Sequence, residues 1–221
     1  MVVVALLCVA AIVALGLLLR GGDEEPATAS DAGCEAAPPL PSNPPSFESP
    51  PDPALAQGAT WNATISTNCG DITLQLDGAK APQTVASFIS LSQQGYFDDS
   101  PCHRLTTGGL FVLQCGDPTG TGTGGPGYTF GIENAPKDGD YPTGTVAMAR
   151  TSAPDSNGSQ FFIVYQDSKL PTDGGGYSIF GTVTGGLSIV KELAKAGVSG
   201  GGSDGAPDQP ISILGVSVER A

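Results

Sequence analysis

The polar side chains that could do chemistry lie within otherwise apolar stretches. Arg104 follows His103, the only histidine of the chain, and Gln114 comes ten residues later in an apolar run. Gln160 directly precedes two phenylalanines. A permanently charged donor and two amides among apolar side chains indicate a cleft. Such a cleft removes water from an uncharged group and directs hydrogen bonds at it.

Hydrolytic chemistry does not fit these residues. A catalytic triad or dyad would have to use His103, and Cys102 beside it would point to the opposite face of a strand. The Gly-rich stretch 118–130 lacks the lysine and the following helix of a phosphate-binding loop. No cysteine or histidine spacing indicates a metal site. We therefore expect no metal and no other cofactor, and a structural role for His103.

One reaction needs no acid, base, nucleophile or metal, namely rotation about an X–Pro amide bond. Its barrier is about 20 kcal/mol, because the C–N bond has partial double-bond character. An apolar pocket disfavours the polar planar amide relative to the twisted one. An N–H donor directed at the prolyl nitrogen stabilises the lone pair that twisting releases. Arg104 suits this role, because such a donor binds the transition state more strongly than the substrate.

Composition narrows the class of protein. The chain has 221 residues, enough for one domain with appendages. Nine basic and 22 acidic residues give a net charge of −13, which argues against nucleic-acid binding. The 32 glycines and 19 prolines predict many turns and little helix.

An apolar run near the start of the chain bears on localisation. Residues 2–19 are 18 consecutive apolar residues, long enough for a short membrane span. We expect residues 1–20 to be a single-pass transmembrane anchor that holds the domain outside the cytoplasm at the cell membrane. A cleaved signal segment and a buried helix are the alternatives.

The cysteines agree with export. Of the five cysteines, Cys8 lies within the apolar run, and the other four, Cys34, Cys69, Cys102 and Cys115, are an even number, which suits an oxidising compartment. The sequence leaves all three possible pairings open. Four free thiols in a reducing cytosol are the alternative.

The chain divides into an N-terminal linker and a domain. Residues 21–58 are acidic and rich in proline, which predicts an extended, semi-stiff spacer and not a packed domain. A proline-rich ligand for a partner is less favoured, since no basic residue flanks the prolines. The domain covers residues 59–221. Apolar periodicity predicts helices within 81–97 and 186–197, and strands within 60–67, 71–76, 111–117, 144–150, 159–165, 177–183 and 209–220.

Four stretches of the domain together resemble the cyclophilins, a family of peptidyl-prolyl cis-trans isomerases. They are "HRLTTGGLFVLQCGDPTGTGTGGPGY", "GTVAMA", "NGSQFFI" and "SIFGTV", in the order and spacing of that family. The anchor and the proline-rich linker are similar to those of membrane-anchored cyclophilins of actinobacteria. The resemblance implies a mainly β fold, a closed eight-stranded antiparallel barrel capped by two α-helices.

The resemblance also implies roles for individual residues. Arg104 corresponds to the catalytic arginine, and Gln114 to the residue that positions it. Phe111 corresponds to a wall of the proline pocket and Phe162 to its floor. The substrate-binding positions are Val112, Ala149, Arg150, Gln160, Leu170 and Tyr177.

Several positions depart from the family pattern. Val112 replaces a methionine, which makes the pocket wall shallower, and Arg150 replaces an asparagine, which adds a positive charge that favours acidic residues before the proline. Lys169 stands where a tryptophan is common and Tyr177 where a histidine is common. Two additional residues between Arg104 and Phe111 shift the alignment of the segment that contains Phe111.

The leading hypothesis is a prolyl isomerase that assists the folding of exported proteins. Its partners would be proline-containing polypeptides and, through the anchor, the membrane; we expect a monomer. The alternative is a cyclophilin-like module that binds proline-containing peptides with little turnover. A scaffold of the cell envelope, for which Arg104 would not matter, is a third.

Overall fold

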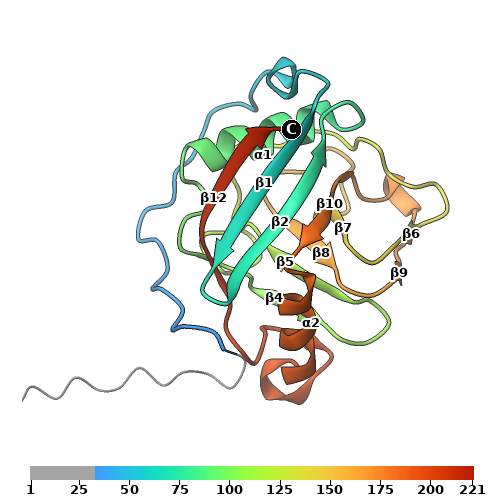
Figure 1. Ribbon diagram of the computed structural model, residues 1–221. Helices are drawn as coiled ribbons and strands as arrows, with labels where there is room; N and C mark the ends of the chain where they lie inside the picture. The colour runs from blue at the N-terminus through green and yellow to red at the C-terminus, as the bar shows by residue number, and fades with distance from the viewer. Residues whose placement is uncertain (1–32) are drawn as a thin grey trace, which may run out of the picture.

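The computed structural model describes residues 33–221 (Figure 1). The predicted anchor, residues 1–20, lies outside the described residues, as does the first part of the predicted linker. Within the described part of the chain, no helix combines the length and the apolar character that crossing a bilayer requires.

Ten strands form one curled antiparallel sheet in the order β11-β4-β5-β8-β7-β10-β2-β1-β12-β3 (Figure 1). A second sheet pairs β6 (Asp140–Tyr141) with β9 (Ser168–Lys169). The strands of the large sheet are β1 (Thr60–Thr67), β2 (Gly70–Asp77), β3 (Ser100–Pro101), β4 (Arg104–Thr106), β5 (Val112–Cys115), β7 (Thr145–Met148), β8 (Phe161–Val164), β10 (Ile179–Gly185), β11 (Asp204–Gly205) and β12 (Ser212–Arg220).

The mainly β fold with two helices is confirmed, but the strand count is not eight. Eight of the ten strands have three or more residues, and β11 and β3 are two-residue strands added at the two ends of the sheet. A two-residue strand has no alternating apolar pattern, so the sequence does not reveal it. The sheet is therefore a curled ten-stranded half-barrel in place of the predicted closed barrel.

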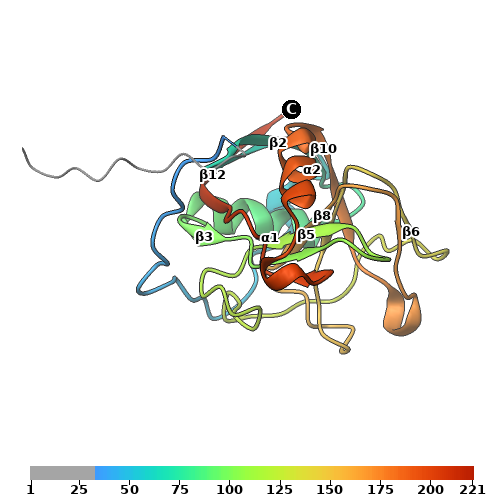
Figure 2. The same cartoon turned by 90° about the horizontal axis from the view of Figure 1, so that it is seen from below.

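The two helices lie toward opposite ends of the sheet (Figures 1 and 2). Helix α1 (Pro82–Gln93) begins with a proline, whose fixed φ suits the first turn. Its buried face carries Phe88, whose ring contacts those of Phe97, Phe161 and Phe180. Helix α2 (Leu187–Ala196) ends before Gly197, which has a φ of 96° that other residues rarely adopt.

Strand β8 is buried on both faces and separates two apolar clusters. Phe161 and Ile163 join the main core under α1, whereas Phe162 and Val164 join a second, smaller cluster on the outer face. This division follows from the alternation of side chains along a strand. The second cluster also contains Val112, Tyr141, Ala147 and Leu170.

Two disulfides settle the pairing that the sequence leaves open. Cys34 is bonded to Cys69, and Cys102 to Cys115. The second disulfide joins the residues just outside β4 and at the end of β5.

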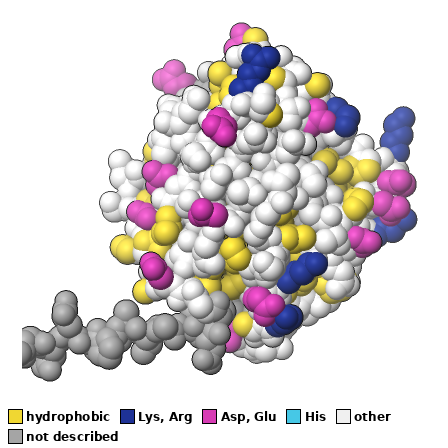
Figure 3. All heavy atoms as spheres, viewed as in Figure 1, with side chains coloured by type: hydrophobic (Ala, Val, Ile, Leu, Met, Phe, Trp, Pro, Cys, Tyr) yellow, Lys and Arg dark blue, Asp and Glu magenta, His cyan; other side chains and the backbone are white. Residues whose placement is uncertain are grey.

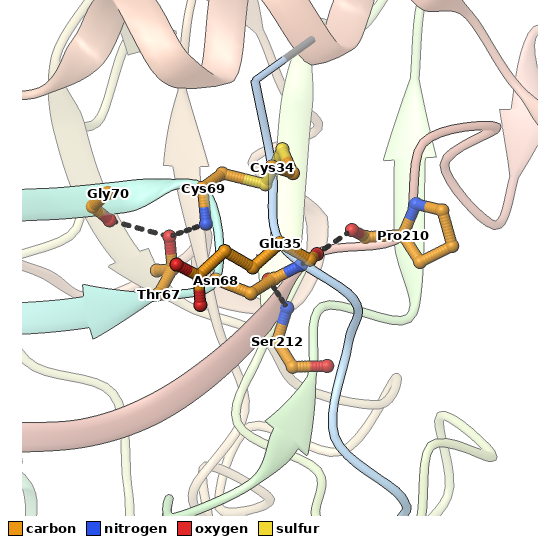
Figure 4. Close-up of a disulfide and its surroundings, with 8 residues drawn as sticks. All are labelled: Cys34, Glu35, Thr67, Asn68, Cys69, Gly70, Pro210 and Ser212. Atoms are coloured by element: carbon orange, nitrogen blue, oxygen red, sulfur yellow. Dashed lines mark hydrogen bonds between the residues drawn. A yellow bond between two sulfur atoms is a disulfide. The ribbon is translucent and has the colours of Figure 1, made fainter. Parts of the chain in front are cut away.

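Residues 33–58, here called the strap, lie within the predicted extended spacer and pack against the domain, a contact that the sequence does not predict. The Cys34–Cys69 disulfide joins the strap to the β1–β2 hairpin (Figure 4). Beside it, the N–H of Glu35 donates to the carbonyl oxygen of Asn68 at 2.7 Å. The amide nitrogen of Asn68 donates to the carbonyl oxygen of Glu35 at 2.8 Å.

The remainder of the strap contacts the loop before β6 and helix α1. The N–H of Phe47 donates to the carbonyl oxygen of Pro126 at 2.8 Å. The short 3-10 helix η1 (Pro53–Ala56) ends in the fully buried Ala56, whose carbonyl oxygen accepts from the indole N–H of Trp61 at 2.9 Å. Apart from η1, the proline-rich strap has no helix or strand, and it still packs against the domain.

Charged side chains are spread over the face of the molecule that Figure 3 shows. Figure 3 shows acidic side chains distributed over the face seen in Figure 1, with basic side chains between them at several points. This face has no basic stripe of the kind that binds a phosphate backbone.

Candidate active site

The predicted catalytic arginine and its predicted partner are direct neighbours across two strands. Arg104 on β4 pairs with Gln114 on β5 in the antiparallel register. Nη1 of Arg104 donates to Oε1 of Gln114 at 3.1 Å. The Cys102–Cys115 disulfide lies beside this pair and links the same two segments. Gln114 thus makes the direct hydrogen bond to Arg104 that the predicted positioning role requires.

Gln114 is itself held by a further amide. Its Nε2 donates to Oε1 of Gln160 at 2.8 Å. Nε2 of Gln160 in turn donates to the carbonyl oxygens of Gly122 at 3.0 Å and Gly124 at 2.9 Å. A line of directed hydrogen bonds therefore runs from Arg104 to the Gly-rich loop and fixes both amides in one orientation.

Asp117 organises this Gly-rich loop. Its carboxylate accepts from the N–H groups of Thr119 at 2.8 Å, Gly122 at 2.7 Å and Gly124 at 3.0 Å. Burial alone would raise the pKa of Asp117, but these hydrogen bonds and one from the Thr119 hydroxyl lower it below its ordinary value. The loop thus has an ionised carboxylate at its centre and a defined shape.

A cavity of about 300 Å³ opens beside Arg104 on the outer face of the sheet. Eight of the ten predicted site residues line it, and Leu110, Lys169 and Pro171 complete the lining. The eight are Arg104, Val112, Gln114, Ala149, Arg150, Phe162, Leu170 and Tyr177. The structure thus brings together most of the residues that the sequence assigns to one site.

The floor of this cavity is aromatic. Phe162 is buried, and its ring centre lies 5.8 Å from that of Tyr177 and 6.2 Å from that of Tyr141. The hydroxyl of Tyr141 donates to the carbonyl oxygen of Tyr177 at 2.9 Å. Burial raises the pKa of Tyr141, so its hydroxyl keeps its proton and remains a donor. The floor therefore offers a rigid apolar surface.

Phe111 does not line the cavity, contrary to the prediction. Its ring packs 6.0 Å from that of Tyr165 and contacts the main core, while Leu110 and Val112 face the cavity. Phe111 directly precedes β5, and continuing the alternation of that strand by two residues puts Leu110 on the face of Val112 and Gln114 and Phe111 on the other. Side-chain alternation counted from Gln114 toward the N-terminus identifies Leu110 as a cavity residue, whereas the family resemblance alone does not.

A second, larger cavity of about 660 Å³ adjoins the first. Gln160 lines this cavity and not the first, as expected for a neighbouring groove. Gln114, Ala149 and Arg150 line both cavities and form the boundary between them. A polypeptide could therefore place one residue in each cavity.

Arg150 is fixed above Tyr177. Its Cζ lies 4.9 Å from the ring centre, within the range of a cation–π contact. Its Nε donates to the carbonyl oxygen of Gly176 at 2.6 Å, and its Nη1 donates to that of Thr151 at 2.8 Å. These neutral partners leave the positive charge of Arg150 uncompensated at the boundary of the two cavities. Lys169, by contrast, pairs with Asp140 at 3.0 Å.

Asp204 is a neighbour of Arg104 that the sequence did not reveal. Its two carboxylate oxygens accept from Nε of Arg104 at 2.7 Å and from Nη2 at 2.8 Å. The two residues are 100 positions apart, and Asp204 belongs to the two-residue strand β11. No local pattern links them, so only the folded structure brings them together.

His103 lies under the Gly-rich loop, away from the first cavity. Neither ring nitrogen has a hydrogen-bond partner within residues 33–221. Burial lowers the pKa of His103, and Arg104 lowers it further, while Asp117 acts in the opposite direction. The histidine does not line either cavity, which agrees with the structural role that the sequence predicts.

The chemistry that the first cavity can support follows from its ionisable groups. Among the described residues that line it, these groups are Arg104, Arg150, Lys169 and Tyr177. None is a carboxylate, a histidine or a thiol, the groups that most often accept a proton or attack a carbonyl near neutral pH. The site is suited to desolvating a neutral group and donating hydrogen bonds to it.

Comparison with known proteins relates this geometry to a family. Residues 62–218 match the family described as cyclophilin type peptidyl-prolyl cis-trans isomerase/CLD. A probable peptidyl-prolyl cis-trans isomerase B of Mycobacterium tuberculosis is 47% identical over 183 residues, and the match covers 77% of this chain and 56% of the relative. The corresponding protein of Mycobacterium leprae is 48% identical over 74% of this chain and 57% of its own length.

A solved structure has a similar fold. The crystal structure of a cyclophilin-type peptidyl-prolyl cis-trans isomerase from Cryptosporidium parvum has a TM-score of 0.61 and 32% sequence identity, and the match covers 72% of this chain and 98% of that one. The same protein has been crystallised in the presence of the dipeptide Ala-Pro. This chain spans somewhat more than half the length of the mycobacterial relatives. The match over most of the domain and the sheet around Arg104 place the chain in the cyclophilin family.

Proposed function

We propose that this chain is a peptidyl-prolyl cis-trans isomerase that acts on proline-containing polypeptides without a cofactor. The observation that carries this proposal is the position of Arg104, a permanently charged donor at the edge of an apolar cavity whose described lining has no carboxylate, histidine or thiol. The activity named for its mycobacterial relatives supports the same reaction. The Ala-Pro dipeptide used with the related crystal structure supports the substrate class.

The reaction follows from the two parts of the site. The proline ring enters the cavity formed by Phe162, Val112, Leu110 and Leu170, which removes water from the X–Pro amide. As the C–N bond twists, conjugation is lost and the nitrogen lone pair becomes an acceptor. An N–H of Arg104 donates to that nitrogen more strongly in the twisted state than in the planar one, which lowers the barrier.

Gln114 and Gln160 contribute by fixing the donor in advance. Because Arg104 is already hydrogen-bonded in the free protein, little reorganisation is needed when the substrate twists. The binding-module alternative would need a similar cavity but no fixed donor. We therefore favour catalysis over binding alone.

The test is cis-to-trans isomerisation of an Ala-Pro peptide by the purified full chain. Arg104→Ala should lower kcat/KM on the order of 100-fold, as for loss of one transition-state donor. Arg220→Ala is the matched control, since Arg220 lies on β12 and its Nη1 donates to Gln57 at 2.9 Å, away from the site. If the wild type binds the peptide but does not accelerate its isomerisation, the chain is a binding module.

We further propose that the protein is a monomer tethered to the outer face of the cell membrane, where it assists the folding of exported proteins. The apolar run at residues 2–19 and the two disulfides support this localisation. Exposure of intact cells to a protease that cannot cross the membrane should degrade the domain. Protection of the domain in intact cells, with cleavage only after lysis, would contradict the proposal.

A further inference from the structure

The ion pair with Asp204 engages two N–H donors of Arg104, a contact that the family resemblance does not predict. A guanidinium carries five N–H donors. Asp204 accepts one from Nε and one from Nη2, and Gln114 accepts one from Nη1. One donor therefore remains on each terminal nitrogen of Arg104. Two donors suit an X–Pro bond in transit, which presents the prolyl nitrogen and a carbonyl oxygen.

We propose that Asp204 is the positioning residue for Arg104: its carboxylate holds the guanidinium so that these two donors face the apolar cavity. This inference rests on the isomerase function proposed above. A bidentate carboxylate on one edge and Gln114 on a terminal nitrogen together fix the plane of the guanidinium. A single hydrogen bond to Gln114 would still allow that plane to rotate.

Asp204 is itself held by backbone pairing. Strand β11 pairs with β4, with Asp204 opposite Thr106, so the carboxylate and the arginine belong to adjacent strands. The N–H of Thr107 donates to the carbonyl oxygen of Ser203 at 2.9 Å and extends this pairing. The two-residue strand thus places one acidic side chain against the catalytic arginine.

The ion pair is too exposed to be important for folding. The side chains of Arg104 and Asp204 are 37% and 55% exposed, and ion pairs of this kind contribute little to stability. Its geometry is nevertheless specific, with both carboxylate oxygens engaged at 2.7 and 2.8 Å. A precise contact with little effect on stability is expected of a residue that orients a catalytic group. It also makes Asp204 a suitable position for substitution.

The charge of Asp204 matters as well as its shape. An unpaired guanidinium at the mouth of the cavity would carry a full positive charge and bind water through all its free N–H groups, and a neutral amide would have to displace that water. With Asp204 in place, the pair is neutral overall while its two remaining N–H groups keep their directions. Asp204→Asn keeps the size of the side chain but removes the charge and one of the two acceptors.

The experiment measures kcat and KM for an Ala-Pro peptide with the full chain and three variants. Asp204→Asn should lower kcat about tenfold with KM within about twofold, because the substrate still fits the cavity but the donor is misplaced. Asp204→Glu should recover part of the loss, since it restores the carboxylate. Asp208→Asn is the matched control: Asp208 lies in the same loop, and its only side-chain hydrogen bond among the described residues comes from Ser199.

A second readout follows Arg104 directly. In the ¹H–¹⁵N spectrum, the Nε–H resonance of Arg104 should exchange slowly with water in the wild type and in Asp208→Asn. It should exchange faster in Asp204→Asn, because the Nε–H loses its charged acceptor. A purely structural role for Asp204 would change stability but would not link this resonance to kcat.

The outcomes separate the two proposals. If the wild type has no activity, the isomerase function fails, and the role of Asp204 falls with it. If the wild type is active and Asp204→Asn has the same kcat, the positioning role is overturned while the function stands. A higher kcat for Asp204→Asn would also overturn it, since Asp204 would then compete with the substrate for Arg104. Equal losses in Asp204→Asn and Asp208→Asn would indicate a general effect on the loop and overturn it as well.

Discussion

The side chain of Gln114 donates to that of Gln160 at 2.8 Å. Gln114, which accepts from Arg104 beside the smaller cavity, is thus oriented by a residue that lines the larger cavity. Gln160 lines only the larger cavity, yet it belongs to the same line of hydrogen bonds as the catalytic donor. Occupancy of the larger cavity and the direction of Arg104 are thereby physically connected.

This connection predicts that Gln160 affects the rate without touching the proline. Gln160→Leu should lower kcat/KM about tenfold, because Gln114 loses its acceptor and the Gly-rich loop loses two donors. Isomerisation of an Ala-Pro peptide is the measurement. Gln94→Leu is the control, since Gln94 caps the end of α1 and, among the described residues, its side chain donates only to Ser90. Unchanged activity of Gln160→Leu would show that Gln114 does not need the hydrogen bond to Gln160 to position Arg104.

The assignment of Leu110, and not Phe111, to the cavity wall predicts opposite effects of two neighbouring substitutions. Leu110→Ala should raise KM about fivefold with little change in stability, because it removes apolar surface that contacts the proline. Phe111→Ala should leave KM unchanged but lower the free energy of unfolding by about 2 kcal/mol, because its ring packs on Tyr165. Steady-state kinetics and urea unfolding of both variants decide the matter. A raised KM for Phe111→Ala together with an unchanged KM for Leu110→Ala would show that Phe111, and not Leu110, contacts the proline.

The uncompensated charge of Arg150 predicts a preference for acidic residues before the proline. With Arg150→Gln, the ratio of kcat/KM for Glu-Pro over Lys-Pro peptides should fall about threefold, the size of an exposed charge interaction. The neutral Ala-Pro peptide is the internal control and should change little. Raising the salt concentration should reduce the wild-type ratio toward that of the variant. A ratio that is insensitive to both changes would exclude Arg150 from substrate selection.

The lowered pKa of the His103 side chain should make the stability of the protein depend on pH. Its pKa in the folded protein lies below the ordinary value of 6.5, so between the two values the unfolded chain binds more protons than the folded one. Stability should therefore fall as the pH is lowered through about 6.5, by at most about 1.4 kcal/mol per pH unit. His103 is the only histidine, so this slope should be absent in His103→Leu. Urea unfolding of the untagged protein between pH 8 and pH 5 measures it, and an equal slope in both proteins would contradict the assignment.

The sequence predicts the parts of the structure that depend on regular patterns. Both helices and the longer strands lie where apolar periodicity places them, and the β1–β2 turn falls at Asn68 and Cys69. The second apolar cluster follows from alternation along β5 and β8. The family resemblance predicts most of the residues around the cavity beside Arg104, because the motif residues of that family line it.

The features that the sequence did not reveal depend on contacts between distant segments. Asp204 reaches Arg104 through a strand of only two residues, which has no periodicity. The packing of the strap depends on the surface it meets, which its proline-rich composition does not encode. Leu110 is different, because strand alternation identifies it once Gln114 is fixed as the reference.

The Cys34–Cys69 disulfide determines where mechanical load enters the domain. Tension applied at Cys34 can pass through the sulfur atoms into the β1–β2 hairpin (Figure 4), whose strands lie between β10 and β12 in the large sheet. Residues 35–58 form a second, longer covalent path from Cys34 to β1, and this path touches the Gly-rich loop where Phe47 donates to Pro126. The disulfide therefore gives a force applied at Cys34 a shorter covalent route into the sheet than the strap does.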